Sequence, residues 1–382
     1  MTVRVSVSPS DKELWSRIDE AAVRSLQWFD AMQVADRPRG VGRSSANHDA
    51  EAWPGMLLPG TYNAIMARAL LGGLDAWRAS EKAVLSEWLL GFRRSDGVFR
   101  VPGMRDDTVF KKPDLDETWR YIDFHVTNYT LGALQALDPE LAPVLDFVAP
   151  FLEPLRLKAW MADRDLRDPW QEGNNIVNLG SFLLLVRKWG SPGQQAAANA
   201  AIDYLFEWHT RNQNPQTGFW GVGQSRGGIP LLHAMAGSMH NYHLYYACRR
   251  EIPNHVAAVD YTLNLATGIH SACIDVDEID LLVHAADTQD YRRGEIADWL
   301  RCKLVALLDF QRPDGGFADA LSGELRQDGW IGGYSEPQGH SNAFSTWFRW
   351  IGMAMADQYL WPGRRDWHFR SMIGIGYRRP TA

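Results

Sequence analysis

Two kinds of helical segment alternate along this chain, and that alternation restricts its possible folds more than any other feature. Six segments are mainly apolar and begin with polar residues, near Tyr62–Leu71, His125–Leu137, Asn174–Val186, Met239–Cys248, Cys273–Ala285 and Ser341–Met355. Six others have the amphipathic spacing of surface helices, near 12–30, 80–93, 141–157, 195–211, 255–267 and 292–310. Because apolar helices must be buried and amphipathic helices can cover them, the pattern predicts an all-α fold, an (α/α)6 toroid of about twelve alternating outer and inner helices.

The spacing of proline and glycine indicates a single domain. These residues fall at fairly regular intervals between the helical segments, and no stretch resembles a flexible linker. Hydrophobic residues make up 46% of the 382 residues, which is enough to bury one large core. We therefore expect one toroid domain over residues 1–382.

Charge and cysteine usage exclude several classes of protein. The net charge is −7, and the basic residues are scattered, so binding to nucleic acid or to an acidic membrane surface is not expected. No apolar run reaches the roughly 18 residues of a membrane span, which predicts that there is no integral membrane segment. Only Cys248, Cys273 and Cys302 occur, and the N-terminus lacks a signal pattern, so we expect a cytoplasmic protein without disulfide bonds.

Three helical segments end in similar glycine-centred turns that are followed by an aromatic residue. They read EWLLGFRRSDGVF, FEWHTRNQNPQTGFW and LVALLDFQRPDGGF, and lie within 85–99, 205–220 and 304–317. Glycine tolerates the positive φ that such tight turns need. We expect the aromatic side chain after each glycine to fold back onto the helices.

The third of these turns resembles a known repeat. The residues from Gln311 to Phe317, QRPDGGF, are similar to the repeat of the prenyltransferase and squalene-cyclase superfamily, and the turn at 212–220 is a looser copy. The resemblance implies an α/α toroid. Related toroids also carry polysaccharide lyases, glycosidases and sugar epimerases, so the fold alone does not assign a reaction.

The strongest local feature is a group of carboxylates at the start of one apolar segment. Asp275, Asp277, Glu278 and Asp280 fall within six residues. Unpaired carboxylates are costly to bury, and crowding raises their pKa values, so that one of them can remain protonated as an acid. Two other interpretations stay open: a metal or diphosphate site, and ordinary acidic capping of a helix N-terminus.

The stretch Asp275-Val-Asp277-Glu278 resembles the Asp-x-Asp-Asp motif of class II terpene cyclases. That resemblance implies that Asp277 protonates an alkene or epoxide and starts a cationic cascade, with Asp275 and Glu278 as its neighbours. Our leading functional hypothesis is therefore an enzyme that cyclises or isomerises an isoprenoid-type substrate without a cofactor. Asp277 would be the general acid, tuned by Asp275, Glu278 and Asp280, and aromatic side chains would stabilise the cation.

A second resemblance concerns zinc. Protein prenyltransferase β-subunits bind zinc through an Asp, a Cys two residues later and a distant His, and Cys273, Asp275 and His340 have the first two ligand types in reversed order. The alternative is that Cys273 is a small buried apolar residue. We expect a protein without a bound metal.

Polar residues recur at the starts of the apolar segments. In a toroid the N-termini of all inner helices face the same end, so these side chains should converge on one mouth and bind a small-molecule substrate. Singly, each one could be a helix cap or an ordinary satisfied polar group. The candidate binding residues are His125, Tyr129, Trp170, Asn174, Asn175, Asn178, His240, Tyr242, His243, His270, His340 and Asn342.

The same mouth also fits a carbohydrate-active enzyme, and this is the alternative function. A lyase, glycosidase or epimerase acting on an intracellular oligosaccharide would use Asn, His and Tyr side chains, for which Asn174, Asn175, His240 and Tyr242 are candidates. Tryptophans would stack on the sugar rings, with Trp119, Trp170, Trp220 and Trp330 as candidates. A third hypothesis is a non-catalytic toroid that binds a glycan or peptide and uses its carboxylates structurally.

Overall fold

The computed structural model describes residues 9–105, 121–221, 231–321, 324–326 and 331–379. This part of the chain is predominantly α-helical, as the sequence predicts, and none of its helices is long and apolar enough to cross a membrane. Its one two-stranded sheet pairs β1 (Glu324–Arg326) with β2 (Ser335–Pro337) in antiparallel register. The α-helices are α1 (Asp11–Ala31), α2 (Leu57–Leu70), α3 (Ala79–Leu90), α4 (Tyr121–Leu137), α5 (Pro154–Ala162), α6 (Pro169–Trp189), α7 (Pro192–Asn212), α8 (Leu231–Cys248), α9 (His255–Leu263), α10 (Ala272–Thr288), α11 (Arg293–Phe310) and α12 (Ala343–Leu360).

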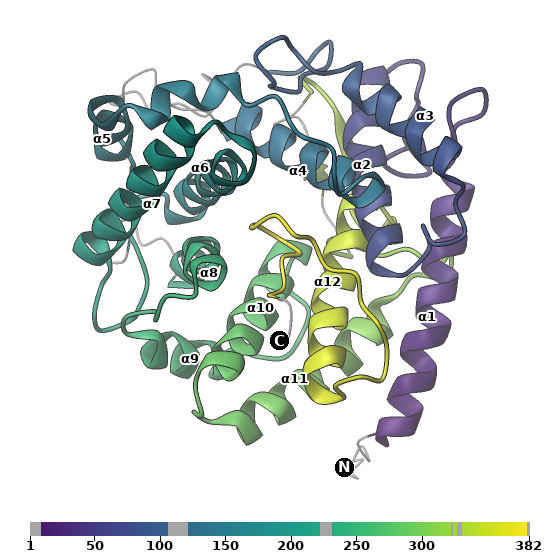
Figure 1. Cartoon of the computed structure of the whole chain (residues 1–382). Helices are drawn as coiled ribbons and strands as arrows, with labels where there is room; N and C mark the ends of the chain where they lie inside the picture. Colours follow the sequence, from purple (N-terminus) through teal and green to yellow (C-terminus); the bar gives the residue numbers. More distant parts are fainter. Residues whose placement is uncertain (1–8, 106–120, 222–230, 322–323, 327–330, 380–382) are drawn as a thin grey trace.

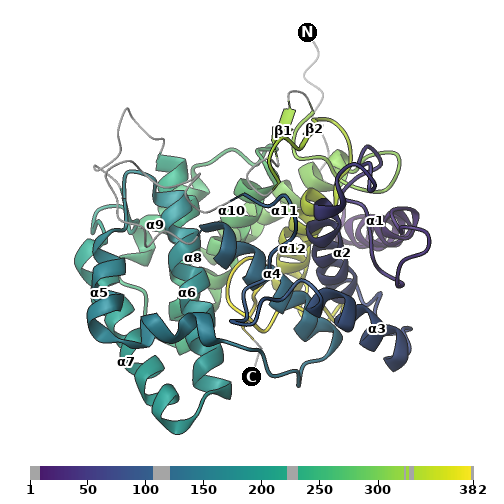
Figure 2. The same ribbon diagram turned by 90° about the horizontal axis from the view of Figure 1, so that it is seen from above.

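The even-numbered helices pack on one another in sequence order. The order of packing runs α2, α4, α6, α8, α10, α12, and α12 packs in turn on α2 (Figure 1). Nearly every residue of these helices is buried, because each has neighbours on both sides and is covered from outside. The odd-numbered helices lie outside them: α1 and α3 on one side, α5 and α7 on the other (Figure 2).

Two pairs of neighbouring even-numbered helices run parallel. A Cβ on Gly173 of α6 would meet the backbone of Gly237 of α8, and further along both helices Gly180 lies against Leu244. On the next pair, Asp275 of α10 bonds to Arg349 of α12, and Ile279 contacts Gly352 further along. Within each pair the N-termini therefore lie at the same end.

The three glycine-centred turns make the same contact with the helix that follows each of them. The backbone N–H of the aromatic residue donates to a hydroxyl of that helix: Phe99 to Thr127 (3.1 Å), Trp220 to Ser238 (3.0 Å) and Phe317 to Thr346 (2.9 Å). All three aromatic side chains are buried, which confirms that they fold back onto the helices. The turn before α2 repeats the contact, since Gly42 N–H donates to Thr61 Oγ1 at 3.2 Å.

The sequence located most helices but misplaced several ends. The buried helix α8 begins at Leu231 rather than near Met239, and α6 begins at Pro169 rather than near Asn174. Small residues such as Gly173 and Gly237 belong to the first two turns of these helices, because the two backbones approach too closely for a Cβ. The prediction of one continuous helix over 141–157 is wrong. A 3-10 helix, η3 (Asp146–Leu152), contains Pro150, and α5 starts afresh at Pro154, because proline interrupts a continuous helix.

A segment that the sequence did not predict follows α12. Residues 361–379 return between the even-numbered helices, where Figure 1 shows them in yellow. Arg370 donates to Asn128 Oδ1 of α4 at 2.7 Å, and Gly374 N–H donates to His243 Nδ1 of α8 at 3.0 Å. This C-terminal segment is therefore tied to two helices that are distant from it in sequence.

Candidate functional site

The four carboxylates of the acidic motif lie in the first half of α10. The helix begins after Ser271, whose hydroxyl accepts from Ile274 N–H at 3.3 Å. Because α10 packs between α8 and α12 and is covered by α9 and α11, all four carboxylates are at most 1% exposed. Their partners, described below, place Asp275 and Glu278 on one face of the helix, towards α11, and Asp280 towards α8.

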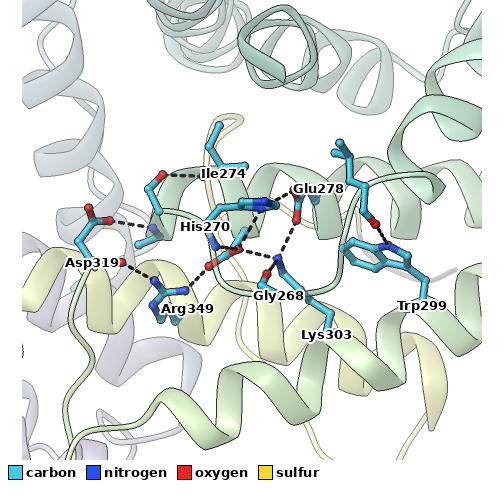
Figure 3. A network of polar contacts seen from close by, with 12 residues as sticks. Gly268, His270, Ile274, Glu278, Trp299, Lys303, Asp319 and Arg349 are labelled. Atoms are coloured by element: carbon cyan, nitrogen blue, oxygen red, sulfur yellow. Dashed lines mark hydrogen bonds and ion pairs between the residues drawn. The ribbon is translucent and has the colours of Figure 1, made fainter. Parts of the chain in front are cut away.

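Asp275 and Glu278 form a buried ion-pair network (Figure 3). The ammonium of Lys303, on α11, lies 2.6 Å from Asp275 and 2.8 Å from Glu278. Arg349, on α12, also pairs with Asp275 and donates to the carbonyl of Asp319 at 2.7 Å. Two buried cations thus balance two buried carboxylates, and the network joins α10 to α11 and α12. Its geometry is that of a structural ion-pair cluster.

His270 adds a partly buried group to this network. Its Nδ1 lies 2.9 Å from Glu278, and its side chain is 32% exposed. In the described part of the chain, His270, Asp275 and Glu278 are the one set of three groups close enough to share a metal ion. The carboxylates of Asp275 and Glu278, however, already contact the Lys303 ammonium, which compensates part of their negative charge.

The suggested zinc set of Cys273, Asp275 and His340 is not what the structure assembles. His340 is exposed on the loop before α12, and the carboxylate of Asp275 is engaged by Lys303 and Arg349. Among the described residues, Asp275 groups with His270 and Glu278 instead. The spacing of these residues in the sequence did not indicate that His270 and Glu278, rather than Cys273 and His340, lie beside Asp275.

Asp280 is held between two histidines. His243 Nε2 and His284 Nδ1 each lie 3.0 Å from its Oδ1. Because His243 Nδ1 accepts the N–H of Gly374, its Nε2 carries the proton and donates to Asp280. Burial by itself raises the pKa of Asp280, but the two histidines outweigh burial and hold that pKa below its ordinary value. Asp280 is therefore an ionised carboxylate that anchors α8 and, through His243, the C-terminal segment.

Asp277 is in the opposite situation. Its side chain is fully buried, and neither carboxylate oxygen has a hydrogen-bond partner among the described residues. Burial raises the pKa of Asp277 well above its ordinary value, and the negative charges of Asp280, Glu278 and Asp275 raise it further. Burial and the neighbouring carboxylates therefore favour the neutral, protonated form of Asp277.

Aromatic residues of α4 lie near Cys273, which is half-buried and one turn before Asp277 on α10. Electrostatic interactions link Cys273 to Tyr121 and Tyr129 on α4, and to Asp277 on its own helix. His125 stacks on Tyr121, with ring centroids 5.5 Å apart, and meets Tyr129 edge-on at 4.3 Å. Burial lowers the pKa of His125 to about 3, so this imidazole is neutral.

Other predicted residues lie deeper between the same helices. Burial lowers the pKa of His240 to about 3, and His243, His125 and Asp280 make smaller contributions to this shift. Asn178 accepts a hydrogen bond from Asn128 at 2.6 Å. His125, Tyr129, Asn178, His240 and His243 are thus distributed around the interior that α10 faces.

Trp170, Asn174 and Asn175 occupy the first turns of α6. Asn174 donates to the carbonyl of Trp170 at 3.0 Å, and Asn175 is fully buried. Trp170 is half-buried, and its ring lies 5.2 Å from that of His233 at the start of α8. These side chains lie where the two parallel helices begin.

Three predicted binding residues are placed elsewhere. The Tyr242 hydroxyl donates to the carbonyl of Gly218, so Tyr242 faces the outer turn between α7 and α8. Asn342 is the N-cap of α12 and accepts from Ser345 N–H at 2.8 Å, and His340 is exposed. Trp220, one of the proposed sugar-stacking residues, is buried in its turn, whereas Trp119 and Trp330 lie outside the described residues.

The sequence analysis missed the cations that define the site. Lys303 interrupts the apolar stripe of Leu300, Leu304 and Leu307 on α11, and Arg349 stands within the apolar sequence of α12. A charged residue inside a buried stripe needs a partner, so these positions were a usable signal. They would have predicted that part of the acidic motif is structural.

No family model matches the chain, and no curated protein sequence matches it either. The resemblance to the prenyltransferase and squalene-cyclase superfamily therefore stays a prediction that rests on the turn and carboxylate motifs.

Proposed function

We propose that this protein is an (α/α)6 toroid enzyme of the terpene-cyclase-like class, with Asp277 as its general acid. The order in which the even-numbered helices pack, returning from α12 to α2, supports an inner ring, and the odd-numbered helices outside it support an outer ring (Figure 1). The repeated contact between each glycine-centred turn and the next helix supports a fold built from repeated helix pairs.

The observation that carries the proposed chemistry is the unpartnered carboxyl of Asp277. Burial without hydrogen bonds favours the protonated form of a carboxyl group, so Asp277 is the candidate proton donor to the interior. Asp275, Glu278 and Asp280 are engaged by fixed partners. They act on Asp277 through their negative charge and keep its proton in place until a substrate arrives.

The reaction that this arrangement favours is protonation of an isoprenoid-type alkene. The O–H bond of Asp277 breaks, a C–H bond forms on the substrate, and the resulting carbocation lies opposite the newly ionised carboxylate. Loss of a proton from a neighbouring carbon to Asp277 restores the acid, so the cycle is balanced without a co-reactant. Tyr121 and Tyr129, which interact with Cys273 one turn before Asp277, would stabilise the cation through the faces of their rings.

This proposal is tested by isotope incorporation. The full chain is incubated in D₂O with a panel of isoprenoid alkenes and prenyl diphosphates, and products are analysed by mass spectrometry for carbon-bound deuterium. Asp277→Asn should reduce turnover at least about 100-fold, within the range of general acid catalysis. The matched control is Asp290→Asn, an exposed residue beyond the end of α10. An Asp277→Asn protein with full activity would rule out this function.

A carbohydrate-active enzyme is the second candidate, and Trp170 favours it. This half-buried indole lies beside His233 at the start of two parallel helices, an arrangement suited to stacking on a sugar ring. Incubating the protein with a panel of oligosaccharides and following cleavage or epimerisation tests this candidate. Activity that depends on Trp170 but not on Asp277 would favour it over the cyclase proposal.

A further inference from the structure

A cavity of about 690 Å³ lies at the ends of α8 and α10, away from the proposed acid. Asp287, which lines it, is ten residues after Asp277 on α10, or about 15 Å along the helix. Its volume is within the range of about 300–1,000 Å³ found for small-molecule sites. Charged and ring residues dominate its lining, and those used below are Tyr245, Tyr246, Arg249, Arg250, His255 and Arg379.

The cavity has more free positive than negative charge. Of its three arginines, Arg250 pairs with Asp203, whereas Arg249 and Arg379 have no carboxylate partner in the described part of the chain. Of its two carboxylates, Asp287 is already paired with Arg378, which leaves Glu251 at the exposed rim. Two unpaired guanidinium groups at one cavity stand out in a chain with a net charge of −7. Guanidinium groups bind phosphate oxygens through paired hydrogen bonds.

Arg249 occupies a position that usually belongs to glycine. It follows the last residue of α8 with φ +54°, and the N–H of Arg250 donates back to the carbonyl of Tyr245 at 3.0 Å. This is the helix ending in which glycine avoids the strain of a left-handed backbone. The left-handed backbone conformation is unfavourable for arginine, so a role of its side chain would explain why arginine stands here instead of glycine.

The N-terminus of α9 supplies further donors. Its N-cap residue, Asn254, makes no side-chain cap to the helix and donates instead to Gln213 at 3.0 Å. The next residue, His255, lines the cavity, is 1% exposed and has no hydrogen-bond partner on either ring nitrogen among the described residues. An uncapped helix N-terminus with a buried, unpartnered imidazole beside it is a suitable site for an anion.

We infer that this cavity binds a small organic phosphate monoester. Arg249, Arg379 and the N-terminus of α9 would hold the phosphate, and the organic part would lie against Tyr245 and Tyr246. The cavity exceeds the size of the phosphate group, which favours an ester over the inorganic ion. This inference does not depend on the function proposed for Asp277.

Calorimetric titration of the full chain tests it, with phenyl phosphate as the probe, inorganic phosphate for comparison and phenol as the uncharged control. Phenyl phosphate should bind more tightly than inorganic phosphate, and phenol should not bind. Arg249→Gln and Arg379→Gln should each weaken binding at least about tenfold, because each removes charge-assisted hydrogen bonds. The matched control is Arg37→Gln, an exposed arginine far from the cavity in sequence and without an ion pair in the described structure.

A second variant separates binding from backbone strain. Arg249→Gly should raise the melting temperature, since glycine suits the left-handed position, and should weaken phenyl phosphate binding as Arg249→Gln does. Unchanged binding in both Arg249→Gln and Arg379→Gln would overturn the inference. Equal weakening by Arg37→Gln, or no binding of phenyl phosphate to the unaltered chain, would also overturn it.

Discussion

Asp277 and Asp280 lie about one turn apart on the same buried helix, and their surroundings shift their pKa values in opposite directions. Two histidines hydrogen-bond to Asp280 and favour its ionised form, whereas Asp277 has no hydrogen-bond partner in the described structure and its raised pKa favours the protonated form. Paired carboxyl groups whose environments separate their pKa values are typical of acid–base sites. This contrast identifies Asp277, rather than the motif as a whole, as the candidate acid.

The raised pKa of Asp277 predicts a pH-dependent stability. Below about pH 4 both the folded and the unfolded chain carry its proton. As the pH rises, the unfolded chain ionises first, so Asp277 reduces the free energy of unfolding by about 1.4 kcal/mol per pH unit until its folded pKa is reached. Asp277→Asn should therefore become progressively more stable than the unaltered protein with rising pH. Urea denaturation of both proteins over a pH series measures this, and a constant difference would show that Asp277 is not protonated.

Asp280→Asn should have the opposite effect. Asp280 has a lowered pKa, so its contribution to stability is complete above its unfolded pKa of about 4 and is lost as the pH falls through the folded value. At neutral pH we expect a loss of about 2 kcal/mol, because the hydrogen bonds from His243 and His284 lose their charged acceptor. The loss should shrink in acid. The N–H of Gly374 donates to His243, so its hydrogen exchange should become faster in Asp280→Asn. The control variant Asp290→Asn should leave that exchange rate unchanged.

Lys303 is predicted to be essential for stability. Lys303→Met leaves the buried carboxylates of Asp275 and Glu278 without their shared ammonium, which should lower the free energy of unfolding by about 3–5 kcal/mol. Adding Glu278→Gln to Lys303→Met removes one uncompensated charge and should restore part of the lost free energy of unfolding. Chemical denaturation compares these proteins with Lys12→Met, an exposed control. A Lys303→Met protein as stable as that control would show that the ion-pair network is not structural.

The repeated turn contact predicts a repeated energetic cost. Thr127→Val and Thr346→Val each remove the acceptor of a backbone N–H, that of Phe99 and that of Phe317 respectively. Each substitution should lower the free energy of unfolding by about 1–3 kcal/mol. Thr130→Val is the matched control on α4, because the hydroxyl of Thr130 bonds only within its own helix, to the carbonyl of Val126. Thermal unfolding of the three proteins measures the difference. Equal effects at Thr127 and Thr130 would mean that the contact adds nothing beyond removal of a hydroxyl.

Local sequence patterns were sufficient for the helices and turns. Three- and four-residue apolar spacing located helices such as α1, α7 and α11 to within a few residues, because that spacing is a property of the helix itself. The aromatic residues after the glycine turns were also predicted to fold back, since turn geometry is local. The starts of α6 and α8 were misplaced because their small residues reflect close packing between helices, which no single segment reveals.

The acidic motif marks the limit of what the sequence by itself determined. It located four carboxylates on one apolar helix, and the cost of burying charge indicated that one of them can remain protonated. Which one depends on cations and histidines supplied by other helices: Lys303, Arg349 and His243 lie 25 to 74 residues from the carboxylates that they contact. Only the tertiary structure decides those contacts, because hydrogen bonds and charge pairing depend on distance in space. In the described chain, Asp277 is the one carboxylate of the four whose two oxygens both lack a hydrogen-bond partner.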